Sequence, residues 1–252
     1  MLKFAGDAVL AAFELPADTA EHPRVAAAAL YCAEALLHLD KVYPAQDAQE
    51  PLTLHVALHC GLLAEMHLGS RAGSLAHLVT GAPCVELGPL IGAAGPEEVV
   101  CSHAFWELLP RGCDAAARAE ALPVGWRLRK PPTLGVFEAR AVSSLAPPSA
   151  DVLASCERYL PPYLVTTLRA GSSAWLAENR RVSCVFFALP TYGAGDFEMA
   201  QAVELELAST VCRLGGSMVQ TITDDKGTVS SALCCVVRMC SARSPSLFSF
   251  HG

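Results

Sequence analysis

Few residues of this chain are of types and spacings that could do chemistry, and the first of them is Asp7. It follows Gly6 in the stretch KFAGDAVLAAF, residues 3–13, with apolar residues on both sides. The pattern predicts two short strands joined by a tight turn, because Gly adopts the backbone angles of such turns and Asp tolerates them. A carboxylate there either shapes the turn or serves as a hard oxygen ligand for Mg²⁺.

Two histidines are a second candidate site. His55 and His59 are four residues apart in the stretch HVALH, which puts them on one face of a helix or of a strand. A zinc site needs a third ligand, and the HExxH motif also supplies a glutamate. We identify no third ligand nearby and no such glutamate, so the spacing alone does not predict a zinc site.

Two other stretches fit a structural role better than a role in phosphate or metal binding. GSRAGS, residues 69–74, is rich enough in Gly and Ser for a phosphate loop, but it lacks the GK[ST] ending and a following helix. We interpret it as a hairpin loop. Cys234 and Cys235 are neighbours in an apolar stretch, and neighbouring side chains on a strand point to opposite faces, so they are not expected to ligate together.

The composition limits the class of protein. Of 252 residues, 52% are hydrophobic and 17% charged, with a net charge of −7, which gives no basic footprint for nucleic acid. Eleven cysteines without a CxxC pair suit free thiols in a reducing cytoplasm. Asp7 interrupts the N-terminal apolar stretch before a signal peptide could form, and no run approaches the ~20 apolar residues of a membrane span.

The elements that would position these residues alternate between strands and helices, which predicts an α/β or α+β fold. In the helix expected at 196–214, apolar residues take one side, and Glu204 and Glu206 are assigned to the other. Pro and Ser in residues 143–150 predict a linker. The expected helices are 18–42, 82–94, 103–109, 151–179 and 196–215. The expected strands are 2–13 as a hairpin, 52–62, 63–70, 74–81, 97–102, 125–142 as two strands broken by a Pro-Pro turn, 181–189, and 217–237 as a further hairpin.

These segments together resemble a known family. LKFAGDAVLAAF resembles the hairpin motif of class III nucleotidyl cyclases, in the form found in soluble, bicarbonate-responsive adenylyl cyclases. HLVTGAPCVELGPLIGAAGPEEVVCSHAFWELL is similar to the family's VIGxAV strand and helix, LRKPPTL to its interdomain link, and GGSMVQTITDDKGTVSSALC to the first hairpin of its second catalytic domain. The resemblance covers most of residues 1–235.

The resemblance implies an α+β fold: a ferredoxin-like βαββαβ cyclase domain that lacks its first strand, followed by a partial second cyclase domain. We therefore expect a first domain at 1–142, a linker with helices at 143–180, the partial second domain at 181–237 and an irregular tail at 238–252. The implied activity is conversion of ATP to cyclic AMP and pyrophosphate, in a pseudo-dimer of cyclase domains or a homodimer.

The resemblance also gives Asp7 a role. In the family, two aspartates hold two Mg²⁺ or Mn²⁺ ions that clamp the attacking and leaving oxygens, and Asp7 matches the aspartate of the hairpin. The strand with the other aspartate would precede Met1. No catalytic residue is assigned, because the family's later Asn and Arg belong to a segment beyond Leu233, where the resemblance stops.

The resemblance implies two binding sites, and in each of them this sequence has a residue that differs from the family's. Lys3 matches a lysine that helps to bind bicarbonate, and Val79 matches a wall of that pocket, but Gly88 stands where the family has an arginine. Bicarbonate binding is thus weakened. Gln220 stands where a lysine reads the adenine edge, and its amide can also hydrogen-bond a base.

Two alternatives remain open on the sequence. The chain could be a non-catalytic fragment or splice product that keeps the cyclase fold and acts as an interaction module. It could also be an unrelated α/β interaction domain, in which case the order of the motifs is a coincidence.

Overall fold

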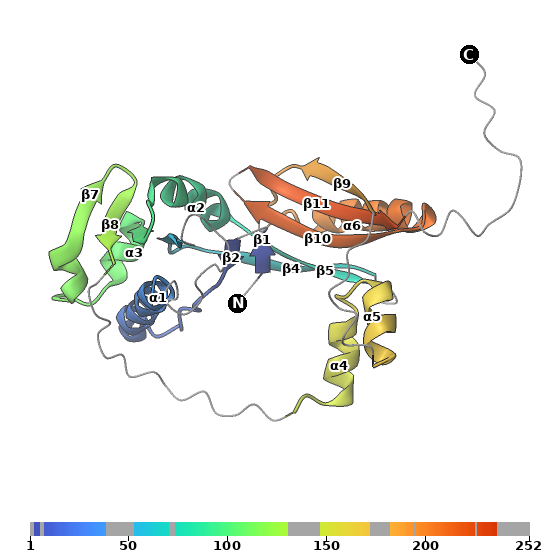
Figure 1. Ribbon diagram of the computed structural model, residues 1–252, viewed down its shortest axis with the longest axis horizontal. Coiled ribbons are helices and arrows are strands. Elements are labelled where there is room, and N and C mark those ends of the chain that lie inside the picture. The colour runs from blue at the N-terminus through green and yellow to red at the C-terminus, as the bar shows by residue number, and fades with distance from the viewer. Residues whose placement is uncertain are drawn as a thin grey trace, which may run out of the picture. The chain divides into compact units, whose positions relative to one another are not determined.

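The computed structural model describes residues 3–5, 8–38, 53–70, 74–130, 147–171, 182–193, 195–224 and 226–235. Helices and strands are mixed along the chain, which confirms the predicted α+β class. The chain divides into two compact units (Figure 1). Unit 1 comprises Met1–Ala64, Val79–Ala146 and Thr223–Lys226, and unit 2 comprises Glu65–Leu78, Pro147–Ile222 and Gly227–Gly252.

The elements of unit 1 are short strands and helices. They are β1 (Lys3–Ala5), β2 (Ala8–Leu10), η1 (Thr19–Glu21), α1 (His22–Leu36), β3 (Val56–Leu58), α2 (Ala82–Ala93), β6 (Glu98–Cys101), α3 (His103–Leu108), η3 (Asp114–Arg118), β7 (Ala119–Leu122) and β8 (Gly125–Arg129).

Unit 2 has longer strands. It contains α4 (Ala150–Glu157), α5 (Pro162–Arg169), β9 (Val182–Leu189), α6 (Phe197–Arg213) and β11 (Gly227–Cys235), together with most of β4 (Ala64–Gly69), β5 (Leu75–Thr80) and β10 (Gly216–Asp224), of which one end each belongs to unit 1.

The main sheet of unit 1 has the strand order β3-β6-β8-β7. β3 runs parallel to β6, with Val56 opposite Val99, while β8 is antiparallel to both β6 and β7. Parallel neighbours need a long crossover connection. Here the crossover includes α2, which directly precedes β6.

Helix α1 builds the core of unit 1 from small residues. Ala26, Ala29, Leu30 and Ala33 recur at three- and four-residue spacing and are all buried, so they form one face of the helix. This face belongs to a single hydrophobic cluster with β6, α3 and β8. Leu128 of β8 is fully buried there.

The β7–β8 hairpin was not predicted. Two strands with a Pro-Pro turn between them are expected at 125–142; the second lies outside the described residues, and β8 pairs with the upstream residues Ala119–Leu122. Gly125 begins β8 with φ +153°, and a Cβ there would lie 2.0 Å from the carbonyl oxygen of Cys101. Only glycine therefore lets this strand approach β6 so closely.

The sheet of unit 2 has the order β10-β11-β9. β11 pairs antiparallel with β9 along its whole length, with Ser230 opposite Phe187. Helix α6 connects β9 to β10 (Figure 1). β9, α6 and β10 therefore form a strand–helix–strand arrangement. In the sheet, β11 lies between β9 and β10.

The β4–β5 hairpin is fastened to the rest of unit 2 by polar contacts. The side-chain amide of Gln201 donates to the carbonyl of Gly69 at 2.7 Å and accepts from its N–H at 2.9 Å. Arg158, which follows α4, donates to the Ser70 carbonyl at 2.6 Å, and its own carbonyl accepts from the Leu75 N–H at 2.8 Å.

Most other elements agree with the sequence predictions. α2 and α6 lie within two residues of their expected bounds, and β9, β10 and β11 match the predicted strand and hairpin. Pro83 falls in the first turn of α2, where its missing N–H costs nothing, and the helix continues through Gly88 and Pro89. The strand expected at 52–62 is limited to Val56–Leu58. In the described ranges, no helix is long and apolar enough to cross a membrane.

Candidate functional site

The predicted metal ligand Asp7 lies outside the described residues, but the strands on either side of it are described. β1 and β2 pair antiparallel, with Lys3 opposite Leu10, Phe4 opposite Val9 and Ala5 opposite Ala8. The predicted hairpin is therefore present around the Gly6-Asp7 pair. The role of Asp7 as a metal ligand stays a prediction.

The predicted anion site has one described wall. Val79, at the end of β5, is 2% exposed, and its carbonyl accepts from the Cys84 thiol at 3.8 Å. Gly88 is a half-buried residue within α2. Because the side chain of Lys3 lies outside the described residues, the bicarbonate site also stays a prediction.

Gln220 lies on β10 in unit 2 and is exposed. Its backbone carbonyl accepts from the Ser231 hydroxyl at 3.4 Å, across the β10–β11 hairpin. The amide of Gln220 therefore faces solvent, where a base could reach it. Among the described residues, no group of three or more His, Cys, Asp or Glu side chains could hold a metal ion.

A buried carboxylate, Glu204, contacts the inner face of the β10–β11 hairpin. Glu204 of α6 was assigned to the solvent side, but it is only 4% exposed. The Thr221 hydroxyl donates to its Oε2 at 3.0 Å, and the Ser230 hydroxyl lies 2.8 Å from that of Thr221. Thr221 is next to Gln220 on β10, so the two side chains point to opposite faces of the sheet.

The buried environment in unit 2 changes the pKa values of Glu204 and Tyr192. Burial raises the pKa of Glu204, and the hydrogen bond from Thr221 partly offsets the rise. Burial also raises the pKa of Tyr192, which is 2% exposed, and the nearby carboxylates of Glu204 and Asp196 raise it further. The interior of unit 2 therefore favours the neutral forms of both groups.

One signal in the sequence could have placed Glu204 correctly. The buried face of the β10–β11 hairpin is polar, with Thr221, Thr223, Thr228 and Ser230 all at most 3% exposed. Two-residue spacing within each strand puts these hydroxyls on one face. Buried hydroxyls need partners, so they favour a polar residue on the helix that covers them.

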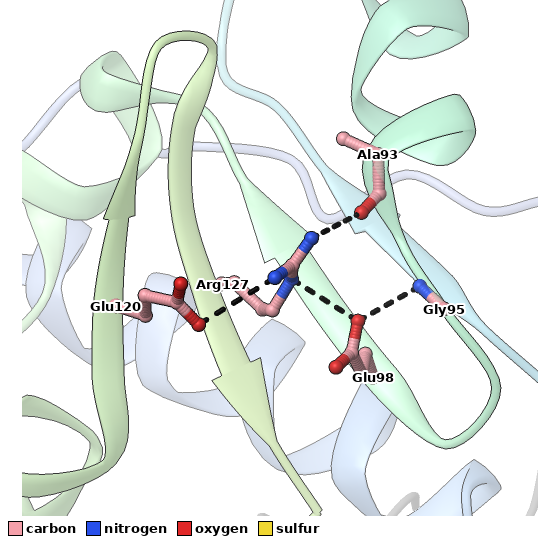
Figure 2. Close-up of polar contacts among 5 residues, drawn as sticks. All are labelled: Ala93, Gly95, Glu98, Glu120 and Arg127. Carbon is pink, nitrogen blue, oxygen red and sulfur yellow. Dashed lines mark hydrogen bonds and ion pairs between the residues drawn. The ribbon is translucent and has the colours of Figure 1, made fainter.

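Arg127 of β8 contacts three groups of unit 1. Its guanidinium lies 3.1 Å from Glu98 Oε2 and 3.5 Å from Glu120 Oε2, and it donates to the Ala93 carbonyl at 3.1 Å. Figure 2 shows Arg127 between these groups, with the Gly95 N–H donating to the same Glu98 oxygen at 2.8 Å. The arginine joins the end of α2 to β6, β7 and β8, which is a structural role.

Comparison of the sequence with family models and with curated proteins finds no match. The functional assignment therefore depends on the residues and geometry described above.

Proposed function

We propose that this chain is an adenylate cyclase of the soluble type, which converts ATP to cyclic AMP and pyrophosphate. The observation that carries the proposal is the β1–β2 hairpin, because the segment with the most specific resemblance to class III cyclases forms paired strands on both sides of Asp7. The proposed location is the cytoplasm, which agrees with eleven cysteines and no CxxC pair.

The arrangement of β9, α6, β10 and β11 supports the same proposal. A strand–helix–strand unit with a third, antiparallel strand inserted between its strands is the first half of a ferredoxin-like βαββαβ fold. β11 occupies that inserted place, between β9 and β10. We infer that this part of unit 2 corresponds to the opening half of a second cyclase domain.

The proposed site uses three side chains with separate tasks. Asp7 would hold the divalent metal ions, Mg²⁺ or Mn²⁺, which offset the negative charge that develops on the transferred phosphate. Lys3 would attract an anion beside the hairpin. Gln220 is exposed on β10 and would contact the adenine edge, both donating and accepting a hydrogen bond.

The test is cyclic AMP production by the purified chain with Mn²⁺ and ATP. Asp7→Ala should abolish turnover, and Glu14→Ala is the matched control, because Glu14 is an exposed carboxylate seven residues away and outside the motif. Gln220→Lys, which introduces the family's residue, should lower the KM for ATP. Turnover that survives in Asp7→Ala would contradict the proposed role of Asp7.

The second candidate function is a non-catalytic cyclase-fold module that acts through interactions. It is favoured by the changed residues at two family positions, Gly88 in α2 and Gln220 on β10. ATP binding without any cyclic AMP formation would select this candidate and overturn the catalytic proposal. Absence of both ATP binding and turnover would contradict the relation to cyclases altogether.

A further inference from the structure

A pocket in unit 1 includes His59, one of the two histidines singled out in the sequence, but neither Asp7 nor Gln220 of the proposed cyclase site. It has a volume of about 200 Å³ and is open to solvent. By the volume that a water molecule takes up in the liquid, it has room for about seven waters. The described residues that line it are His59, Glu86, Pro89, Leu90, Ser102 and Val124.

The position of the pocket in the fold is typical of a ligand site. His59 directly follows β3, and Ser102 directly follows β6, and these two strands are parallel neighbours. The Ser102 N–H donates to the Leu58 carbonyl at 3.0 Å, which holds the two strand ends together. Ligands of open α/β sheets bind outside the carboxyl ends of parallel strands, where such residues meet.

Helix α2 supplies the opposite wall. Glu86, Pro89 and Leu90 lie at i, i+3 and i+4, so they share one face of the helix. Glu86 Oε2 lies 3.1 Å from His59 Nε2, and the carboxylate side chain is 58% exposed. This contact occupies one carboxylate oxygen and leaves Oε1 to meet a donor from solvent or from a ligand.

His59 is held firmly but is incompletely paired. Its side chain is only 8% exposed, and within the described part of the chain its Nδ1 is buried without a hydrogen-bond partner. A Cβ on Gly61 would lie 3.3 Å from His59 Nε2 and 2.7 Å from Pro83, so there is little room around the ring. A buried polar atom without a partner is rare. The ring is held by its Nε2 contact with Glu86 and by the close packing around it.

The charge of the lining selects among ligand classes. Glu86 is its one acidic residue, and neither Lys nor Arg is among the described lining residues. The pocket therefore disfavours anions such as bicarbonate or a nucleotide phosphate and favours a cation. Pro89, Leu90 and Val124 add an apolar surface. One carboxylate and one imidazole are too few ligands for a structural metal site.

We propose that this pocket binds a small alkylammonium compound, with its ammonium group on Glu86 and its alkyl part on the apolar walls. The site is independent of the cyclase reaction, because it uses neither Asp7 nor Gln220. Its volume is below the 300–1,000 Å³ of pockets for drug-sized ligands, so the ligand has few non-hydrogen atoms.

The test uses three probes with the same carbon chain and different charge: butylammonium, 1-butanol and butyrate. Binding is followed by NMR titration of the intact chain, through the methyl signals of Leu90 and Val124 and the ring signals of His59. Butylammonium should give saturable shifts at all three residues, with a Kd on the order of millimolar for so small a ligand. Butanol should bind several-fold more weakly, and butyrate should give no saturation.

The variant Glu86→Gln should weaken butylammonium binding about fivefold, as expected for the loss of a partly exposed ion pair, and should leave butanol binding unchanged. Glu107→Gln is the matched control, because Glu107 is an exposed carboxylate on α3 outside the pocket. Butyrate binding as tight as that of butylammonium would overturn the proposal. So would the absence of saturable butylammonium shifts, or an unchanged affinity in Glu86→Gln.

Discussion

The buried carboxylate of Glu204 should make the stability of the protein depend on pH in a particular direction. Burial raises the pKa of Glu204 in the folded chain above its ordinary value of 4.5. As the pH rises past 4.5, the unfolded chain releases this proton while the folded chain keeps it, so the folded state loses free energy relative to the unfolded state. The loss is complete once the pH exceeds the raised pKa, and it is absent below the ordinary pKa.

The size of this effect follows from proton linkage. One proton held by the folded chain and not by the unfolded chain changes the free energy of unfolding by at most about 1.4 kcal/mol per pH unit. Glu204→Gln keeps the shape of the side chain and an oxygen that accepts from Thr221, but it carries no proton to release. The variant should therefore gain stability over wild type steadily as the pH rises through this window.

The assay is urea unfolding at a series of pH values from about 4 to 8, comparing each variant with wild type at every pH so that other titrating groups cancel. Glu206→Gln, an exposed glutamate on the same helix, is the control for the loss of one charge. Thr221→Val removes the hydrogen bond that lowers the pKa of Glu204, so it should extend the window to higher pH. A difference between Glu204→Gln and wild type that does not change with pH would refute this reasoning.

Three further predictions concern the packing that supports the proposed sites. Leu128→Ala, at a fully buried position, should lower the free energy of unfolding by about 2–5 kcal/mol, measured by urea unfolding. Glu34→Gln should cost about 2 kcal/mol, the size of a hydrogen bond to a charged group, because the largely buried Arg118 loses the carboxylate that lies 2.6 Å away; a double-mutant cycle with Arg118→Met should show a coupling of similar size. Gln201→Ala removes both hydrogen bonds to the backbone of Gly69, so it should cost about 1–2 kcal/mol and speed amide hydrogen exchange at Gly69.

Local patterns in the sequence were enough to predict the long elements. The alternation in residues 217–237, with Asp-Asp-Lys-Gly in the middle, predicted the β10–β11 hairpin, and apolar spacing predicted α6 almost to the residue. These signals are local, because a helix or a tight hairpin is specified by residues close together in the chain. The pairing of β11 with β9 joins residues that are about 40 to 50 positions apart in the chain, and no local pattern specifies it.

Prediction from the sequence failed for side chains whose burial and contacts depend on tertiary packing. Glu204 and Glu206 were both assigned to solvent because both are charged, although residues two positions apart on a helix lie on roughly opposite sides of it. The hydroxyls of Thr221 and Ser230 lie on a different hairpin, and they make burial of Glu204 tolerable by supplying hydrogen bonds. The same limit applies to His59, since its contact with Glu86 depends on where α2 packs relative to the end of β3.

Several basic residues of unit 1 are already paired with glutamates, which makes them poor candidates for binding a triphosphate. Arg118, Arg127 and Lys130 each lie within ion-pair distance of at least one glutamate, and Lys130 is 2.6 Å from Glu97. These cations could bind phosphate only by giving up carboxylates that already hold them, which costs part of any affinity gained. In the proposed cyclase, metal ions at Asp7 would offset part of the charge of ATP and Lys3 would attract an anion, so the metal site and the anion site both depend on the first hairpin.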